Sequence, residues 1–447
     1  MQLGKKLLIL FFVIIFAGLY WNGAVKQLKF VNINMDATDQ SVYMRYAQSM
    51  YENNYNFIGH RNQMPVYPFI QSLFYRSGMS DNELFLTGKY VNIILSMILL
   101  LLIGLILRQS FNWLHGLILF LIFSFTVFIF KAGYFQSELL FYFLNLCFFL
   151  LVFKLLKEPS WPLAILTGLV GGLAHLTKAS ILPGLLIFLI IASIKGGWAV
   201  YKYWQSKPEG IQAKQMKLYL LVVPLVGLSF LVTVFPYIQT SKRVFGSYFY
   251  NVNSTYFMWY DSWEEAKQDI GAHGYLEGPP DMPPDEIPSM SRYLREHTLN
   301  DILQRFNMGG ERIIKNMANS YGYFKYFLIY LIVLIITQIF NWAKHRKMPQ
   351  LDLFNLVFLS AYFGLYFLLY SWYVPIAEGN RLVLAQFMPA MFAISLGLQE
   401  TLKTSVVKLF ERPVPALFVI NGVVLLVLLV DIYLILTVRI INTWSGS

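Results

Sequence analysis

The chain has 447 residues, of which 57% are hydrophobic and only 13% are charged. Soluble domains carry roughly 25% charged residues, whereas several apolar runs in this chain reach the length of about 20 residues that crosses a bilayer. The formal net charge of +11 does not indicate nucleic acid, because Lys and Arg gather in the cytoplasmic loops of membrane proteins and the chain has no zinc-finger, RNP or P-loop pattern. The composition therefore predicts an all-α polytopic membrane protein.

The apolar runs predict about eleven transmembrane helices. The first has a basic start and no small-residue cleavage site after it, so we expect it to be retained. The fifth is short and rich in small residues, as is typical of helices packed inside a bundle. The single cysteine, Cys147, lies within an apolar run, which argues against disulfides and Cys-based metal sites. The expected spans are residues 5–23, 90–107, 113–130, 138–154, 161–176, 179–195, 218–236, 326–342, 352–372, 381–399 and 414–438.

The distribution of Lys and Arg predicts the orientation of these spans. With a cytoplasmic N-terminus, one set of loops collects most of the cations, and each short loop of the other set holds a single one. Two long polar segments, 24–89 and 237–325, then fall on the extracytoplasmic side of the plasma membrane. The chain thus divides into a transmembrane core with its first outer loop (1–236), an outer loop or lid (237–325) and C-terminal helices (326–447). The cytoplasmic cations are Arg108, Lys154, Lys157, Lys195, Lys202, Lys207, Lys214, Lys217, Lys344, Arg346, Lys347, Lys403, Lys408 and Arg412.

The first outer loop opens with DQSVYMRYAQSMYENN, which starts at Asp39. Apolar residues recur there at helical spacing, so we expect an amphipathic helix with Thr38 as its N-cap. The residues that carry this pattern are Val42, Tyr46, Ala47 and Met50.

Two acids, Asp36 and Asp39, stand at the start of that helix. As ordinary first-turn or turn residues they would interact favourably with the helix dipole. In the functional interpretation, a carboxylate just outside the first span meets a lipid-borne substrate. Tyr43 lies four residues after Asp39 and shares its helix face.

The segment GHRNQMPVYPFIQSLFY follows in the same loop. Pro65 and Pro68 start or break a helix, and the residues after them predict a second helix that lies on the membrane surface. His60 fits a solvated loop histidine or a ligand-binding one. Arg61 has the planar guanidinium that suits phosphate.

Isolated cations stand at the outer ends of the later spans. Lys131, Lys178 and Arg381 either extend to the lipid headgroups or belong to a site with acidic partners, because an unpaired charge at the hydrocarbon boundary is costly. Glu138 begins a helix on the same face. We therefore predict a site at the outer membrane boundary.

The second outer loop, 237–325, contains the stretch NSTYFMWYDSWEEAKQD and a proline-rich stretch, GPPDMPPDEIPSM. The aromatic and acidic stretch suits sugar rings and hydroxyls, but it equally fits an amphipathic surface segment. The proline-rich part indicates a lid or a linker. No metal-binding motif is present, so no cofactor is expected, although the acids and His60 have the chemistry to hold a divalent cation.

The stretch from Asp39 to Met50 resembles the opening of the first outer loop in GT-C glycosyltransferases, which include protein O-mannosyltransferases and bacterial lipid A aminoarabinose transferases. Asp39 falls on the acid of that family, and Gln40 stands where the family often has Glu. Three further stretches resemble the family in the same order: GYFQSELLFYFLN with Glu138, GGLAHLTKASILPGLLIFL with Lys178, and EGNRLVLAQFMP with Arg381. The resemblance covers about the first 200 residues and 371–399. Asn62-Gln63 stands where lipid A-type relatives have Glu-Lys, which leaves donor contacts there to Arg61.

This resemblance implies a glycosyltransferase of the cell envelope. The donor would be a sugar on a polyprenyl phosphate, and the acceptor would be a hydroxyl of a glycan, lipid or protein. Asp39 would act as the base, Lys178 and Arg381 would bind the phosphate, and Glu138 would orient these groups or bind the sugar. Tyr43, His60 and Arg61 would line the substrate site, and Asp36 and Lys131 would support it. Single displacement would invert the anomeric carbon.

Three other classes fit the same sequence. A flippase for lipid-linked sugars would use the same cations, but such transporters have repeats and broken helices at the midplane, which this sequence does not show. A polymerase or ligase of lipid-linked glycans also has many spans and a large outer loop. A non-catalytic partner subunit is the third, because Gln40 and Asn62-Gln63 depart from the family pattern.

Overall fold

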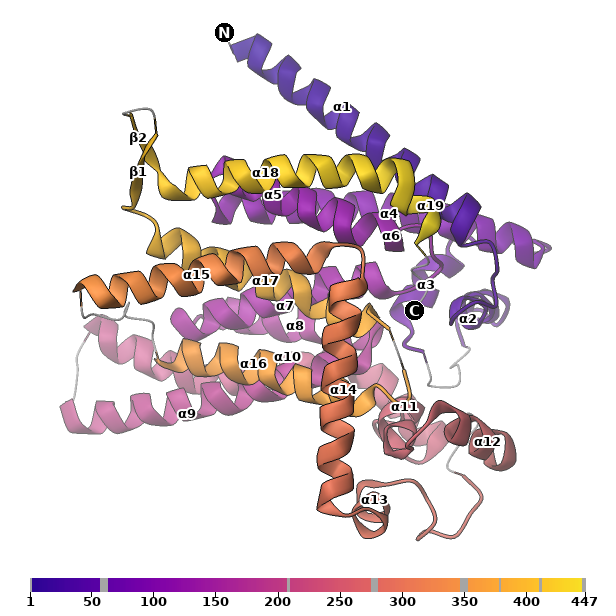
Figure 1. The fold of residues 1–447 in the computed structure, drawn as a ribbon. Coiled ribbons are helices and arrows are strands. Elements are labelled where there is room, and N and C mark those ends of the chain that lie inside the picture. Colours follow the sequence, from indigo (N-terminus) through magenta and orange to yellow (C-terminus); the bar gives the residue numbers. More distant parts are fainter. Residues whose placement is uncertain are drawn as a thin grey trace.

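The computed structural model describes residues 2–56, 63–206, 210–274, 280–345, 353–377, 379–409 and 412–443. Most of its long helices form one bundle, in which the chain crosses back and forth along the same axis, whereas α1 is oblique and its N-terminal part projects from the bundle (Figure 1). The long helices are α1 (Gln2–Lys26), α4 (Asp81–Ser110), α5 (Trp113–Phe123), α7 (Glu138–Lys157), α8 (Trp161–Thr177), α9 (Leu182–Ser206), α10 (Gly210–Phe245), α15 (Tyr323–His345), α16 (Leu353–Tyr373), α17 (Arg381–Thr401) and α18 (Ala416–Leu434).

Shorter elements connect or extend the long helices. The short α-helices are α2 (Gln40–Glu52), α3 (Val66–Ser72), α6 (Ile129–Lys131), α11 (Val252–Thr255), α12 (Trp263–His273), α13 (Met290–Glu296), α14 (Leu299–Asn319) and α19 (Ile440–Asn442). The π-helical and 3-10 segments are η1 (Gln27–Val31), η2 (Ser124–Phe128), η3 (Ala179–Ile181), η4 (Phe257–Trp259) and η5 (Ile435–Arg439). The strands β1 (Val406–Leu409) and β2 (Arg412–Pro415) form an antiparallel hairpin that the sequence analysis did not predict.

The structure confirms a multi-pass helical membrane protein. In the part of the chain that the structure describes, ten helical segments are long and apolar enough to cross a bilayer. The remaining predicted span, the fifth, corresponds to α8, an apolar helix of 17 residues that is shorter than these. A helix satisfies all its backbone hydrogen bonds internally, which is what the interior of a bilayer demands.

Several helices extend further than the apolar runs predict. Helix α4 begins at Asp81, because Ser80 and Glu83 form a reciprocal capping box at its N-terminus. Helix α10 continues to Phe245. Both predicted outer loops, 24–89 and 237–325, are therefore shorter than expected.

The small residues of α8 have the packing role that the sequence predicts. A Cβ added at Gly168 would lie 2.5 Å from the backbone oxygen of Val226 on α10, and one at Gly172 would lie 2.5 Å from the Thr233 side chain. Only glycine permits so close an approach of the two helices.

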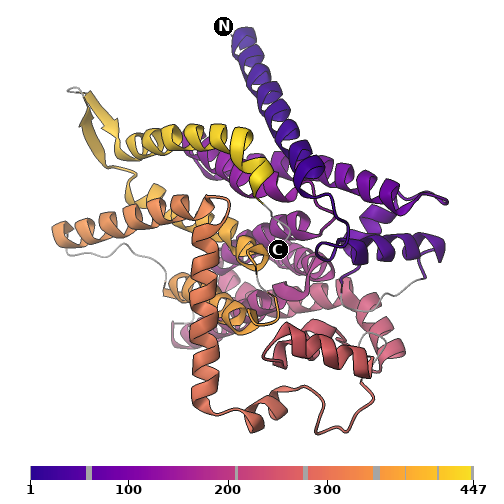
Figure 2. The same ribbon diagram turned by 45° about the vertical axis from the view of Figure 1, so that its right-hand side comes forward.

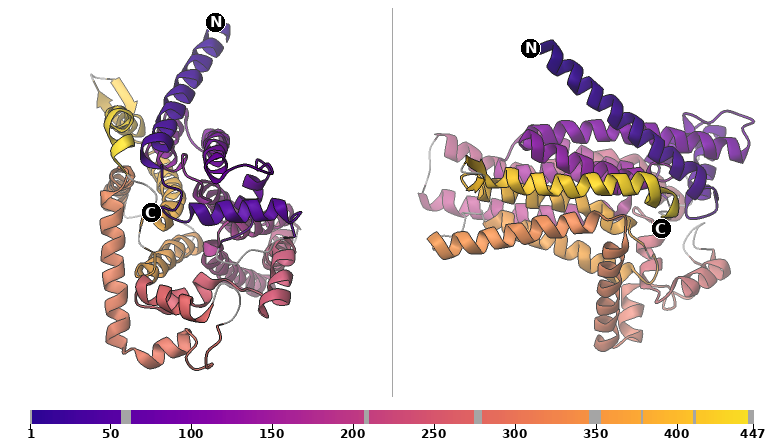
Figure 3. Two further views of the ribbon diagram at one scale, coloured as in Figure 1. Left: turned by 90° about the vertical axis from the view of Figure 1, so that its right-hand side faces the viewer. Right: turned by 45° about the horizontal axis from the view of Figure 1, so that its top comes forward.

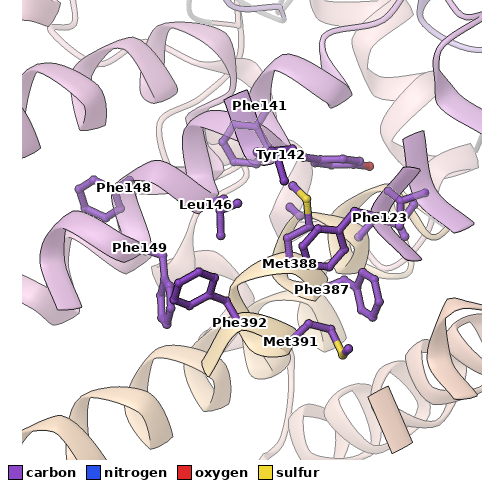
Figure 4. Close-up of a cluster of buried hydrophobic side chains, with 14 of the residues drawn as sticks. Phe123, Phe141, Tyr142, Leu146, Phe148, Phe149, Phe387, Met388, Met391 and Phe392 are labelled. Carbon is purple, nitrogen blue, oxygen red and sulfur yellow. The ribbon is translucent and has the colours of Figure 1, made fainter. Parts of the chain in front are cut away.

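Helix α7 forms the centre of the bundle, and α17 packs along it. Phe141, Leu146 and Phe149 of α7 approach Met388 and Phe392 of α17 in a continuous aromatic and aliphatic core (Figure 4). Because Glu138 begins α7 and Arg381 begins α17, this packing brings both charged residues to the same end of the bundle.

The remaining helices gather at that end. Figure 1 and Figure 2 show α2, α3 and α11–α13 there, whereas the β1–β2 hairpin lies at the opposite end. Helix α14 runs across the axis of the long helices (Figure 3). A second, smaller aromatic core, which includes Tyr250, Phe257 and Ile376, holds α11 and α12 to the segment after α16.

Candidate functional site

Asp39 and Arg381 form an ion pair between α2 and α17. Arg381 Nη1 donates to Asp39 Oδ2 at 2.7 Å, and 23% of the Arg381 side chain and 42% of the Asp39 side chain are exposed. Of the two alternatives for Arg381, extension to the lipid headgroups or pairing with an acid, the structure shows the pairing: the guanidinium is held by the Asp39 carboxylate. The backbone carbonyl of Arg381 accepts a hydrogen bond of 2.8 Å from Tyr142 on α7, which fixes the start of α17.

The start of α2 differs from the prediction in one respect. The N-cap is Asp39, not Thr38, and among the described residues the Asp39 side chain makes no capping hydrogen bond. Thr38 has a positive φ of 83° and accepts a hydrogen bond of 2.7 Å from Gln136. The Asp39 carboxylate is thus directed to another helix instead of its own N-terminus.

Glu138 and Lys178 form a second ion pair. Lys178 Nζ lies 3.1 Å from Glu138 Oε1, and the Glu138 side chain is only 3% exposed. Lys178 follows the last residue of α8 in an extended conformation, which points the chain toward η3. The other carboxylate oxygen, Glu138 Oε2, is buried and has no hydrogen-bond partner within the described ranges. A buried acceptor of this kind is costly unless a ligand or water donates to it.

Lys131 lies in the same cluster. It is 1% exposed, its Nζ is 5.8 Å from the centre of the Tyr134 ring, and its charge interacts with those of Glu138, Arg381 and Lys178. The charge cluster thus consists of three basic side chains, Lys131, Lys178 and Arg381, and two acidic ones, Asp39 and Glu138. When all five are ionised, one positive charge is in excess.

Tyr43 interacts electrostatically with members of both ion pairs, Glu138 of one and Asp39 and Arg381 of the other. Its hydroxyl lies 2.9 Å from Ser137 Oγ, next to the start of α7. Burial, together with the negative charges of Glu138 and Asp39, raises the pKa of the Tyr43 hydroxyl far above its ordinary value. Tyr43 therefore remains a neutral hydrogen-bonding group and does not act as a base.

The pattern of buried residues in α2 is close to the prediction but shifted. Tyr46, Ala47 and Met50 are buried as expected, whereas Val42 is 39% exposed. Its place on the inner face is taken by Tyr43, which lies three, four and seven residues before the buried Tyr46, Ala47 and Met50 and so shares their side of the helix.

Gln40 explains why an amide stands beside Asp39. It is fully buried and pairs reciprocally with the side-chain amide of Asn32, at 2.8 Å in both directions. Gln40 Oε1 also accepts from the Phe135 backbone N–H at 2.8 Å, and Nε2 donates to the Ala37 carbonyl at 3.2 Å. Asn32 in turn donates to the Gly133 carbonyl at 2.8 Å. A glutamate would lack the donor, so this position serves to join α2 to the segment before α7.

Of three further predicted residues, Asp36, His60 and Arg61, the structure describes only Asp36. Asp36 is exposed, and its backbone N–H donates to Asn34 Oδ1 at 3.0 Å. His60 and Arg61 lie outside the described residues. In the part of the chain that is described, no group of three or more His, Cys, Asp or Glu residues is arranged to hold a metal ion.

The structure adds residues that sequence reasoning missed. Tyr373, at the end of α16, interacts electrostatically with Arg381 and Asp39, and its hydroxyl donates to Asn253 Oδ1 at 3.2 Å. Asn380, just before Arg381, has a buried Oδ1 for which the described residues supply no donor. These residues share no local motif, and only the packing of α11, α16 and α17 brings them together.

Comparisons with family models, curated proteins and solved structures found no match.

Proposed function

We propose that the protein is a membrane glycosyltransferase of the GT-C type, which moves a sugar from a polyprenyl-phosphate donor to an acceptor hydroxyl with inversion at the anomeric carbon. The observation that supports it best is the charge cluster. The cluster contains two ion pairs and a buried lysine. These residues come from four distant parts of the sequence and meet at one end of a transmembrane bundle.

The charges of the cluster fit the donor. A phosphate that links a sugar to a lipid carries one negative charge, and the cluster has one positive charge in excess when ionised. After transfer, the lipid phosphate carries more negative charge. Arg381, Lys178 and Lys131 would stabilise this charge as it develops, which is electrostatic catalysis by groups already in place.

Both carboxylates of the cluster, Asp39 and Glu138, are paired with cations before any substrate binds. Phosphate oxygens would compete with Asp39 for the Arg381 guanidinium, because Arg binds carboxylate and phosphate with the same planar fork. Once this exchange occurs, Asp39 faces the acceptor hydroxyl and takes its proton as the hydroxyl attacks the anomeric carbon. The free oxygen of Glu138 and that of Asn380 are acceptors for sugar hydroxyls.

The orientation predicted from the cationic loops would put this chemistry outside the cytoplasm. With the N-terminus in the cytoplasm and α8 as an eleventh crossing, the end of the bundle that holds the charge cluster is extracytoplasmic, and the cationic loops are on the other side. Helices α2 and α3 would then lie at the membrane interface, where a lipid-borne donor and a water-borne acceptor meet.

The test is transfer by the purified protein in liposomes with radiolabelled polyprenyl-phosphate sugars and an envelope extract as acceptor. We expect Asp39→Asn to abolish transfer, while the control Asp36→Asn, three residues away on the surface, retains it. Transfer that survives in Asp39→Asn would exclude Asp39 as the base. Movement of the labelled lipid across the bilayer without transfer would replace the proposal by a flippase.

A further inference from the structure

Helix α14 carries an exposed apolar stripe that the charge cluster does not use. Leu299, Leu303 and Ile314 are 72%, 58% and 53% exposed, and they recur at helical spacing on one side of α14. At 1.5 Å per residue, this stripe is about 22 Å long. The helix is well defined at its start, where Thr298 and Asp301 form a capping box.

Another side of α14 packs against the protein. A Cβ added at Gly309 would lie 1.9 Å from the Ser371 carbonyl oxygen of α16, so the two backbones are in direct contact. Arg305, which is 4% exposed, donates to the Trp372 carbonyl at 3.0 Å and to Asp261 at 2.9 Å. The stripe borders this attached face: Gly310, which lies on the same side between Leu303 and Ile314, also contacts α16, with a Cβ there 3.3 Å from the Phe367 ring, whereas the three stripe residues remain exposed.

The stripe lies next to the part of the bundle that a membrane covers. Met317, at the end of α14, lines an open apolar cavity of about 520 Å³ together with residues of α15, α16 and α17, which are candidate spans. Helix α14 runs across these spans (Figure 3) and passes into α15 after Gly322. The exposed polar residues Gln304, Glu311 and Lys315 lie on the remaining side of the helix.

We infer that α14 docks onto the surface of the bilayer, with the apolar stripe inserted at the boundary between the headgroups and the hydrocarbon of the leaflet nearest the charge cluster. Amphipathic helices that lie in this plane bury their apolar side about 5–10 Å deep. Phospholipid is the occupant that fits, because the stripe runs parallel to the membrane and continues into a surface formed by membrane-spanning helices. A protein partner would have to displace that lipid. The inference does not depend on the proposed glycosyl transfer.

The sole cysteine makes this inference testable in the full-length protein. In a Cys147→Ala background, a single cysteine replaces either Leu303 on the stripe or its neighbour Gln304 on the polar side, and each is labelled with an environment-sensitive fluorophore in phospholipid vesicles. Both positions are exposed, so neither label disturbs the packing. We expect spin labels on lipid chains near the headgroups to quench the label at 303 several-fold more than that at 304, and aqueous iodide to show the opposite order.

Two outcomes would overturn the inference. Equal iodide quenching at 303 and 304 would show that the stripe faces water. Protection of 303 that depends on protein density in the vesicle, with energy transfer between labelled copies, would show that a second copy covers the stripe instead of lipid. Labels at 299 and 314 repeat the test at both ends of the helix.

Discussion

Replacement of Gln40 by Glu tests whether the reciprocal amide pair of Gln40 and Asn32, called the amide clamp below, positions the charge cluster. Gln40 Nε2 donates to Asn32 Oδ1 at 2.8 Å and to the Ala37 carbonyl at 3.2 Å, and an ionised glutamate donates to neither. A buried acceptor left without a donor costs about 1–3 kcal/mol. Asn32 is 2% exposed and cannot be rehydrated, whereas Ala37 is half-buried, so we expect a total loss of about 2–4 kcal/mol in the free energy of unfolding.

The assay is a denaturant titration of the purified protein in mixed micelles, at neutral and at acidic pH. The loss is smaller at acidic pH, because a protonated carboxyl regains an O–H that donates to Asn32 Oδ1. The matched control is Gln304→Glu, the same chemical change at an exposed position of α14, which changes stability by less than about 0.5 kcal/mol.

The same variant has a functional readout. Because the clamp joins the residue after Asp39 to the segment before Glu138, its loss moves the two acids relative to each other. Transfer then slows while the KM for the donor changes little, since the cations that bind phosphate keep their places. A Gln40→Glu protein that is as stable as the Gln304→Glu control, or equally stable at both pH values, would refute the reasoning.

Three further changes probe other parts of the structure. Arg381→Gln raises the KM for the lipid-phosphate donor at least tenfold in the liposome assay, because it removes the phosphate ligand and leaves Asp39 unpaired; unchanged donor KM would place the phosphate elsewhere. Gly309→Ala destabilises the protein by about 1–3 kcal/mol in thermal unfolding through the contact with α16, whereas Gly271→Ala, where a Cβ meets nothing within 4 Å, stabilises it by about 0.5–1 kcal/mol. His297→Gln removes a pH-dependent contribution to the free energy of unfolding. Burial by itself lowers the pKa of His297, but the hydrogen bond to Asp261 and nearby negative charges raise it above its ordinary value. The contribution is therefore complete at pH values below about 6.5 and disappears as the pH rises through the folded-state pKa; a stability difference that does not change with pH would contradict it.

The helices of this protein were largely predictable, because a bilayer imposes one simple rule on long apolar runs. The starts of α7 at Glu138 and of α17 at Arg381 agree with the sequence prediction. Helix α14 was missed, although Thr298 and Asp301 form a local capping signal and its apolar residues recur at helical spacing. Its length of 21 residues was hidden because Gly309 and Gly310 weaken the helical signal, while in the structure they permit contact with α16.

The pairing of charges was beyond local reasoning. Helical spacing predicts that Asp39 shares a face with Tyr43, but the partner of its carboxylate is 342 residues away. Asp431 shows the same limit: the sequence suggested no role for it, and in the structure it accepts a hydrogen bond from Tyr326 and pairs with Lys325. Long-range partners depend on which helices pack together, and no local spacing encodes that.

The position of Gln40 bears on how many acids the proposed reaction uses. In the resemblance to GT-C enzymes, the glutamine beside Asp39 is, with Asn62-Gln63, a departure that leaves a non-catalytic partner subunit as an alternative. The structure gives the glutamine a task of its own, since its amide both donates and accepts in a buried network. A second carboxylate, that of Glu138 at the start of α7, belongs to the same cluster, since the charge of Arg381 interacts with both Asp39 and Glu138. In the proposed reaction the site therefore keeps two acids, Asp39 and Glu138, although position 40 itself supplies none.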